Sequence, residues 1–143
     1  MYKHKHIGSY GLIIKDEKIV LIRKGRGAYT GKLDLPGGSF EHGETPEETV
    51  IREIKEELGR DVISCSLFDA NSCRVEWYVK QRDDIEDLHH IGFFYKIEID
   101  NDLVKSDEDG FDSLGAAWYN INELKEDDVS PLTWIELQKL GYK

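Results

Sequence analysis

The chain of 143 residues is predicted to fold as one α/β domain in which helices cover both faces of a mixed sheet. Three observations lead to this prediction. Short apolar runs typical of strands recur along the chain, an amphipathic helix follows an early glycine turn, and a second helix is signalled near the C-terminal end. The length suits a single domain that buries a core without disulfide or metal cross-links.

Two strands are predicted near the N-terminus. Residues 7–14 are mostly apolar and are expected to form a central strand, and residues 18–22 follow after a polar turn. A basic, glycine-rich loop spans residues 24–31, and residues 33–35 lead into the turn Pro36-Gly37-Gly38. The glycine turn therefore lies between a strand and a helix.

A helix is predicted over residues 46–58. Thr45 is a good N-cap, Pro46 suits the first helical position, and Glu48 lies where a capping box needs an acid. Gly59 is expected to end the helix. These local signals agree with one another, which fixes both helix ends.

The helix has an apolar stripe and, beside it, an acidic one. At about 100° per residue, the acidic stripe contains Glu53, Glu56 and Glu57. Like charges at these spacings repel, and a hard divalent cation would compensate for them. Oxygen-only ligands suit magnesium or manganese better than zinc. An ExxEE pattern on a helix is by itself more often a solvated face. The surrounding sequence must therefore decide between a solvated face and a metal site.

Further elements are predicted downstream. Strands are expected near residues 62–68, 74–79, 91–99 and 116–119. Residues 80–88 are charged and rich in Asp, and we expect a mobile loop there. Residues 123–128 are expected to form a turn or short helix, and Ser130-Pro131 start a terminal helix over 132–140.

The stretch from Gly38 to Arg60 resembles the Nudix box, GX5EX7REUXEEXGU, in which U is an aliphatic residue. Gly38, Glu44 and the run from Arg52 to Gly59 match every other fixed position, and the last aliphatic position holds Arg60 instead, with Val62 as the replacement contact. The resemblance covers roughly residues 5 to 140, and the chain is identified as a member of the Nudix (MutT-like) hydrolase family.

This resemblance implies a Nudix-type α/β/α sandwich with a mixed β-sheet. It also implies metal-dependent hydrolysis of a nucleoside diphosphate linked to another group, by attack of water on phosphorus. Such a step needs in-line geometry, cations that offset phosphate charge, and a base or metal that activates water.

The resemblance also assigns roles to residues of the box. Glu56 and Glu57 are expected to bind Mg²⁺ or Mn²⁺, and Glu53 is either a further ligand or the general base. The backbone carbonyl of Gly37 is expected to reach the metal, since a glycine allows a close approach. Arg52 is expected to pair with Glu44 and to orient Glu53. Structural support is expected from Gly38, Glu44 and Gly59.

The family brings another acid from the loop before its last strand. Here that loop is Ser106 to Asp112, and Asp112 is the favoured metal ligand, with Glu108 and Asp109 as alternatives. A run this acidic is often only a solvated loop. It lacks the spacing of an EF-hand.

Cations beside the glycine turn are candidates for binding substrate phosphates. Arg23 ends the second predicted strand and could clamp phosphates bidentately, with Lys24 and Arg26 assisting it. Each alone would be read as a surface charge. The five histidines show no ligand spacing and are expected to be structural or exposed.

Composition narrows the partners. The net charge of −10 disfavours a nucleic-acid polymer, whose binding depends on Lys and Arg. The chain has no run of roughly 18 apolar residues and no signal peptide, so we expect a cytoplasmic protein without membrane contact. Cys65 and Cys73 are expected to be buried thiols. The expected partner is a small nucleotide-type substrate, and a homodimer is left open.

The substrate is less well determined. Markers of the branches acting on NADH, ADP-ribose and coenzyme A are absent, and Thr133 lies where the branch that cleans oxidised nucleotides would place a base-reading Asn. A nucleoside triphosphate, giving a monophosphate and pyrophosphate, is the first candidate. Trp77-Tyr78 is a weak pointer to dinucleoside polyphosphates. Alternatives of another class are a nucleotide-binding sensor without turnover and an acidic partner-binding domain.

Overall fold

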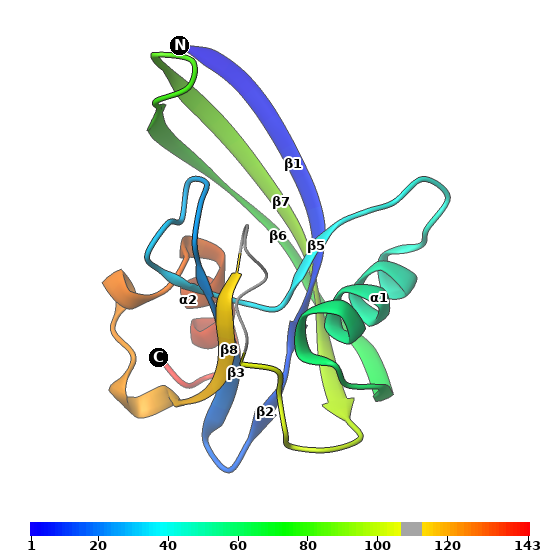
Figure 1. The fold of residues 1–143 in the computed structure, drawn as a ribbon. Coiled ribbons are helices and arrows are strands. Elements are labelled where there is room, and N and C mark those ends of the chain that lie inside the picture. The colour runs from blue at the N-terminus through cyan, green and yellow to red at the C-terminus, as the bar shows by residue number, and fades with distance from the viewer. Residues whose placement is uncertain (107–112) are drawn as a thin grey trace.

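The computed structural model describes residues 1–106 and 113–143, which form two four-stranded sheets flanked by helices (Figure 1). The long sheet has the strand order β5-β1-β7-β6. Its strands are β1 (Tyr2–Leu12), β5 (Gly37–Ser39), β6 (Val62–Val79) and β7 (Asp84–Ile99). Because β1 runs parallel to β7 while the other pairs are antiparallel, this sheet is mixed, as expected. The apolar first strand is an interior strand, which confirms its predicted central place.

The short sheet is antiparallel and centres on β3. It consists of β2 (Ile14–Lys15), β3 (Lys18–Lys24), β4 (Leu33–Asp34) and β8 (Ser113–Asn120). β3 pairs with all three other strands, and a register shift between Ile22 and Lys24 interrupts its pairing with β8. The last strand was predicted only over the apolar residues 116–119. The observed strand β8 is longer than this apolar run.

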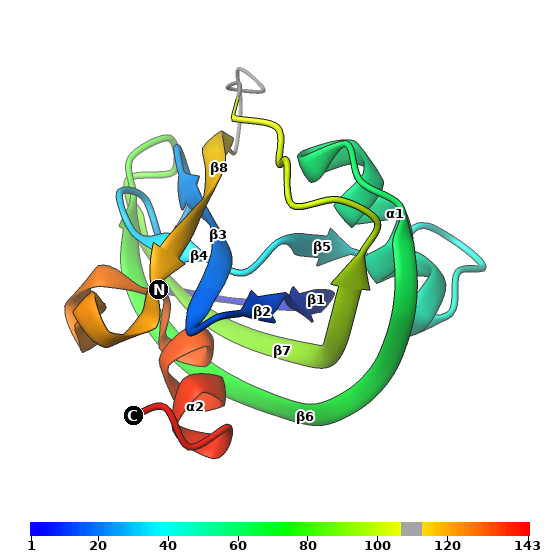
Figure 2. The same ribbon diagram turned by 90° about the horizontal axis from the view of Figure 1, so that it is seen from below.

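Two helices flank the strands on opposite sides (Figure 2). They are α1 (Pro46–Leu58) and α2 (Pro131–Lys139), and two short 3₁₀ helices (Ile121–Glu123 and Glu126–Asp128) precede α2. Alternate residues of β3 point to different sides: Ile19 and Leu21 join the core cluster that contains α2, and Val20 and Ile22 join the cluster that contains α1. The strands thus bury one core on each face, which is the sandwich expected from the sequence.

The helix α1 has the predicted bounds because its caps are local. The Thr45 hydroxyl accepts the Glu48 N–H at 3.1 Å, and the Glu48 carboxylate accepts the Thr45 N–H at 3.1 Å, which makes the predicted capping box. Gly59 ends the helix with a φ of 69°, a left-handed conformation that glycine adopts without strain.

The prediction of a mobile loop over residues 80–88 is wrong. Only residues 80–83 form the turn, because β7 begins at Asp84 and pairs with β6 along its whole length, including the polar stretch that separated two predicted strands. Backbone pairing with both β6 and β1 stabilises these residues whatever their side chains are. Polarity was therefore a misleading signal here.

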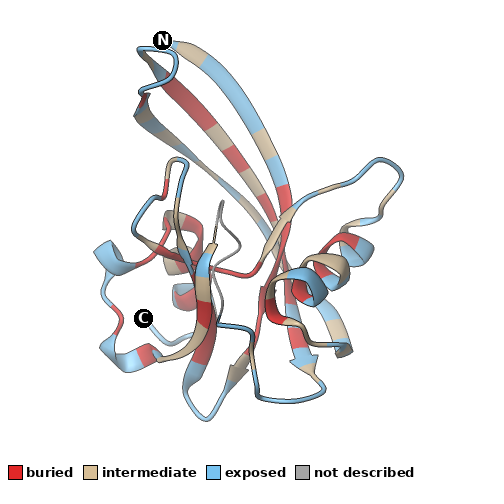
Figure 3. Cartoon of the chain, in the orientation of Figure 1, coloured by how far each residue is buried: buried red, intermediate tan, exposed pale blue. Residues whose placement is uncertain are grey.

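Part of the long sheet extends beyond the body of the molecule (Figure 1). We call residues 74–89 the projecting hairpin; residues 2–6 of β1 pair with its β7 strand. Most of this stretch of β1 is exposed, in contrast to the buried residues 8–13 (Figure 3). The hairpin therefore adds little to the core, and one face of it overhangs the site described next.

Candidate active site

A cleft of about 1020 Å³ runs from α1 to the projecting hairpin. Its walls come from β1, β3 and the loop after it, β5, α1 and the hairpin. The predicted metal-site residues that line it are Gly37, Glu53, Glu56 and Glu57. The structure thus brings the acidic stripe of α1 and the glycine turn together at one end of this cleft.

Glu57 is the most perturbed acid in the cleft. Its Oε1 accepts the Gly37 N–H at 3.3 Å. Burial raises the pKa of Glu57 well above its usual range, and a hydrogen bond and charge from Glu53 raise it further, whereas Gly37 N–H and Lys24 act in the opposite direction. A cation bound beside Glu57 would therefore favour the charged form of this side chain.

Arg52 connects the carboxylates of this region. Its Nε and Nη2 donate to the two oxygens of Glu44 at 2.7 and 2.9 Å, so the expected pair is present and bidentate. Its Nη1 donates to Glu53 at 2.9 Å and lies 3.3 Å from Glu56. Its Nη2 also donates to the Ser39 carbonyl at 3.0 Å. Arg52 thereby fixes Glu53 against both the loop and β5.

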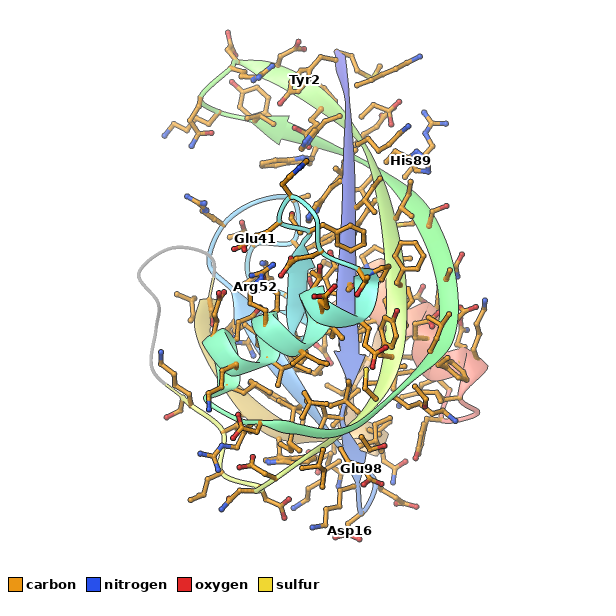
Figure 4. The ribbon with its side chains drawn as sticks, turned by 90° about the vertical axis from the view of Figure 1, so that its right-hand side faces the viewer. Tyr2, Asp16, Glu41, Arg52, His89 and Glu98 are labelled. Atoms are coloured by element: carbon orange, nitrogen blue, oxygen red, sulfur yellow. The ribbon has the colours of Figure 1, made fainter. Side chains whose placement is uncertain are left out.

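Glu44 is held in place from several directions. Hydrogen bonds from Arg52, followed by those from the Glu41 N–H and the Thr49 hydroxyl, lower the pKa of Glu44 to about 2. Glu41 itself lies beside Arg52, with its Oε1 3.6 Å from Nη1 (Figure 4). Glu44 therefore stays ionised and keeps Arg52 oriented at any pH near neutrality.

The two glycines of the turn are required by space. Gly37 has a φ of 146°, and a Cβ there would lie 2.1 Å from the Ser9 carbonyl oxygen. A Cβ on Gly38 would lie 2.8 Å from Cδ of Glu53. Gly38 thus gives Glu53 the room it occupies.

The donor set fits a hard divalent cation. Among the described residues, no three His, Cys, Asp or Glu side chains already surround a metal position, since Arg52 engages Glu53 and Glu56. However, magnesium or manganese would stabilise two neighbouring acids that offer only oxygen donors and whose like charges repel each other. The predicted ligand Asp112 and the alternatives Glu108 and Asp109 lie outside the described residues.

The structure separates the two cations at the end of β3. Lys24 lines the cleft, as does Ile22 two residues before it, and the Lys24 charge acts on Glu57. Arg23 points to the other side, where its Nη1 donates to the Gly31 carbonyl at 2.9 Å and it lines a smaller depression. Strand alternation explains the difference. Arg26 lines the cleft from the following loop.

Sequence reasoning missed a polar floor in the cleft. The His90 ring is buried between two tyrosine hydroxyls, with Tyr10 Oη 2.6 Å from Nε2 and Tyr29 Oη 2.8 Å from Nδ1. Burial lowers the pKa of His90 to about 4, so the imidazole is neutral at pH 7. His6 stacks on His90 with ring centroids 5.0 Å apart. These residues lie far apart in the sequence, so no spacing could reveal them.

Asp34 forms another part of this floor. Its Oδ1 accepts the Leu35 N–H at 2.8 Å and the Ser130 hydroxyl at 2.7 Å, and Thr133 Oγ1 lies 3.3 Å away. Asp34 therefore joins β4 to the start of α2 while it also lines the cleft. Thr133, considered from the sequence as a base-reading position, is buried and occupied by this contact.

Two remaining features are the cysteines and the apolarity of the helices. Cys65 and Cys73 are free but only half-buried, so they are more accessible than predicted. Within residues 1–106 and 113–143, no helix combines the length and apolarity needed to cross a bilayer.

Comparison with known proteins yields matches over most of the chain. A model described as NUDIX domain matches residues 4–138. The 8-oxo-dGTP diphosphatase of Escherichia coli is 30% identical over 131 residues, covering 90% of this chain and 91% of that protein. The ADP-ribose pyrophosphatase of Methanocaldococcus jannaschii is 49% identical over 59 residues, covering 41% of this chain but only 35% of that protein.

The matches differ in how much of each relative they cover. Putative nudix hydrolase 1 of Caenorhabditis elegans is 33% identical over 117 residues, covering 80% of this chain and 27% of that protein. The chain thus spans about a third or less of the length of the archaeal and nematode relatives.

Solved structures agree with the fold. A MutT NUDIX hydrolase from Burkholderia pseudomallei superposes with a TM-score of 0.70 at 24% identity, covering 96% of this chain and 98% of that one. A MutT protein from Bacillus halodurans gives a TM-score of 0.68 at 22% identity, covering 95% and 82%. At these identities the likeness shows the fold alone.

Proposed function

Because this chain belongs to the Nudix hydrolase family, we propose that it is a metal-dependent pyrophosphohydrolase that cleaves a nucleoside diphosphate linked to another group. The observation that carries this proposal is the pair Glu53 and Glu57, which both line the large cleft; burial and, after it, the neighbouring Glu53 raise the pKa of Glu57. A divalent cation in the cleft would favour the charged form of Glu57.

In this proposal the cation is Mg²⁺ or Mn²⁺, held by Glu53, Glu56, Glu57 and the Gly37 carbonyl, with Asp112 as a further ligand. The bound ion would offset charge on the phosphate oxygens and lower the pKa of a bound water. Glu53 is either a ligand or the general base. Arg52 positions Glu53 through its contacts with Glu44 and Ser39, which is compatible with either role.

Lys24 is the residue we propose to bind substrate phosphates. It lines the cleft on the same side as the carboxylates, and its charge already acts on Glu57. Arg26 and Lys105 also line the cleft and can add positive charge. Arg23, expected from the sequence to be the main clamp, is directed away from this cleft by its bond to Gly31.

A nucleoside triphosphate is the first candidate substrate, with a monophosphate and pyrophosphate as products. Relatives named as an 8-oxo-dGTP diphosphatase and as nucleoside triphosphatase NudI support this class, whereas another relative is named as an ADP-ribose pyrophosphatase. A dinucleoside polyphosphate is the second candidate. It is favoured by one specific observation, the position of Trp77 and Tyr78 in the cleft wall.

The test is a screen of nucleoside triphosphates, dinucleoside polyphosphates, ADP-ribose, NADH and nucleotide sugars, with and without magnesium, in which products are identified chemically. We expect magnesium-dependent cleavage of a phosphoanhydride bond in at least one class. Binding without turnover of any compound would instead support a nucleotide sensor. The absence of both binding and turnover would leave the acidic, partner-binding alternative.

A further inference from the structure

The projecting part of the long sheet has two free edges. Among the described strands, β6 pairs with β7 alone and is the last strand of this sheet, whose outer rim it forms in Figure 2. At the opposite edge, β5 covers β1 only at residues 8–10, so residues 2–7 of β1 pair on one side alone. A free edge presents unpaired backbone N–H and carbonyl groups to any strand that can reach it.

The two edges differ in how they are protected. The free part of β1 carries the exposed Lys3 and Lys5, and lysine is a usual residue for preventing association between sheet edges. The edge of β6 has no such protection. Residues 69–79 pair one to one with residues 84–94 without a bulge, and residues 70–79 contain no Lys and no Pro. This long, regular edge is therefore suited to pairing with a further strand.

The charges on this edge are incompletely paired within the chain. Within residues 70–79, Arg74 and Glu76 are the only charged residues. Arg74 Nη2 donates to Asp87 at 2.6 Å, yet the Arg74 side chain remains 70% exposed. Glu76 forms no hydrogen bond or ion pair with any described residue, and in the sheet it lies opposite Asp87, a like charge. Because like charges directly opposite each other destabilise a sheet, a cation on the outer side of β6 would stabilise this strand.

A second copy of the same edge supplies that cation in one antiparallel register. When Val75 lies on a two-fold axis, Arg74 of each copy lies opposite Glu76 of the other copy. An axis at Arg74 or at Glu76 would instead place two like charges directly opposite each other. An axis at Cys73 or at Trp77 would lose both ion pairs. Of these five registers, only the one centred on Val75 matches the charges.

We propose that this protein forms a symmetric dimer in which the β6 strands of two copies pair antiparallel about Val75, so that the two long sheets become one continuous sheet. Two ion pairs between Arg74 and the partner's Glu76 fix the register, and the Val75 side chains of the two copies pack together. The partner's Cys73 lies opposite Trp77, which lines the cleft, so the wall of each cleft continues into the other copy. The dimer is independent of the proposed hydrolysis.

Sedimentation equilibrium over a wide range of protein concentrations tests the ion pairs. We expect the wild-type protein to be dimeric at the upper end of that range. Glu76→Arg and Arg74→Glu should each raise the dimer dissociation constant at least about tenfold, because two repulsive pairs replace two ion pairs. The double variant Arg74→Glu/Glu76→Arg should restore the dimer, and so should an equimolar mixture of the two single variants, in which opposite charges meet again. Lys5→Glu, on the other free edge, is the control and should change the constant by no more than about twofold.

Disulfide formation tests the register. In a background of Cys65→Ser and Cys73→Ser, Val75→Cys should form an interchain disulfide on mild oxidation. The reason is that directly opposite residues of antiparallel strands have Cα atoms about 4.5–5.5 Å apart, within the reach of a disulfide. Ser72→Cys is the control and should not cross-link, because Ser72 lies opposite the partner's Tyr78, about 20 Å along the strand from the partner's Ser72.

Three results would overturn the proposal. The first is a wild-type protein that stays monomeric at every concentration, which would leave the β6 edge to a strand of another protein. The second is a charge-swapped double variant, or a mixture of the single variants, that associates no more tightly than each single variant alone. The third is the absence of a cross-link in Val75→Cys, or its appearance in Ser72→Cys instead. Melting temperatures identify any variant that fails to fold.

Discussion

Two helices of this protein each bury a glutamate beside a second acid, yet only one pair faces a cleft. In α1, Glu57 lies next to Glu53; in α2, Glu136 is completely buried next to Asp69. Burial is the largest cause of a raised pKa in both, and the second acid adds to it. The electrostatics of the two pairs are therefore alike in direction and in cause.

The surroundings of the two pairs differ. Glu57 accepts the Gly37 N–H and lines the cleft with Lys24. Asp69, beside Glu136, is instead neutralised by Lys139, whose Nζ lies 2.7 Å from it. A perturbed acid pair is thus not by itself a functional site. Access to a cavity distinguishes the pair that can bind a metal.

The largest expected effect separates these two glutamates directly. Glu57→Gln should lower magnesium-dependent kcat by at least about 100-fold, because the amide keeps the shape of the side chain but carries no charge for the metal. Glu136→Gln should leave kcat within about twofold. Rates at saturating magnesium measure both. Retention of more than a tenth of wild-type activity in Glu57→Gln would contradict the assignment of this pair.

For Glu136 the expected effect is on stability, measured as the free energy of unfolding at different pH values. The pKa of Glu136 is raised from 4.5 to about 8, so the folded state keeps a proton that the unfolded chain releases above pH 4.5. The contribution of Glu136 to the free energy of unfolding therefore falls as the pH rises from about 4.5 to 8. It falls by at most about 1.4 kcal/mol per pH unit.

Urea unfolding from pH 5 to 9 measures this effect. The stability of Glu136→Gln relative to wild type should increase across that window and level off above pH 8, because an amide has no proton to retain. A difference that stays constant with pH would show that Glu136 is ionised in the folded state.

A smaller effect should distinguish the two neighbouring cations of β3. Lys24→Ala should raise the transition-state barrier by about 1.5 to 3 kcal/mol, the usual contribution of a hydrogen bond to a charged group, and so lower kcat/KM at least tenfold. Arg23→Ala should leave kcat/KM unchanged, since Arg23 bonds to Gly31 outside the cleft. If Arg23→Ala were the damaging variant, the phosphates would bind on the other side of β3.

The smallest expected effect concerns the additional metal ligand. Asp112→Asn should raise the magnesium concentration for half-maximal activity severalfold, whereas Glu108→Gln and Asp109→Asn should not, because Asp112 is nearest in sequence to the last strand. Parallel magnesium titrations at fixed substrate and pH measure this. A shift in Glu108→Gln alone would move the assignment within the loop, and no shift in any variant would leave α1 and the substrate as the metal site.

The accuracy of the sequence predictions followed the range of the interactions involved. The bounds of α1 depend on Thr45, Glu48 and Gly59, all within or next to the helix, and they were predicted correctly. The strands β6 and β7 depend on pairing between residues up to 37 positions apart, as between Val62 and Ile99, and the polar first residues of β7 were misread as loop. Backbone hydrogen bonds between strands leave no periodic trace in such a segment.

The sequence by itself determined the family, the acidic stripe of α1 and the capping that orients it, because these depend on residues a few positions apart. Only the tertiary structure decided that Lys24 and not Arg23 faces the cleft, since strand alternation must be combined with the position of the sheet. It also brought His90 between Tyr10 and Tyr29, and Trp77 to the far end of the cleft. Those contacts join residues up to 80 positions apart, and packing alone creates them.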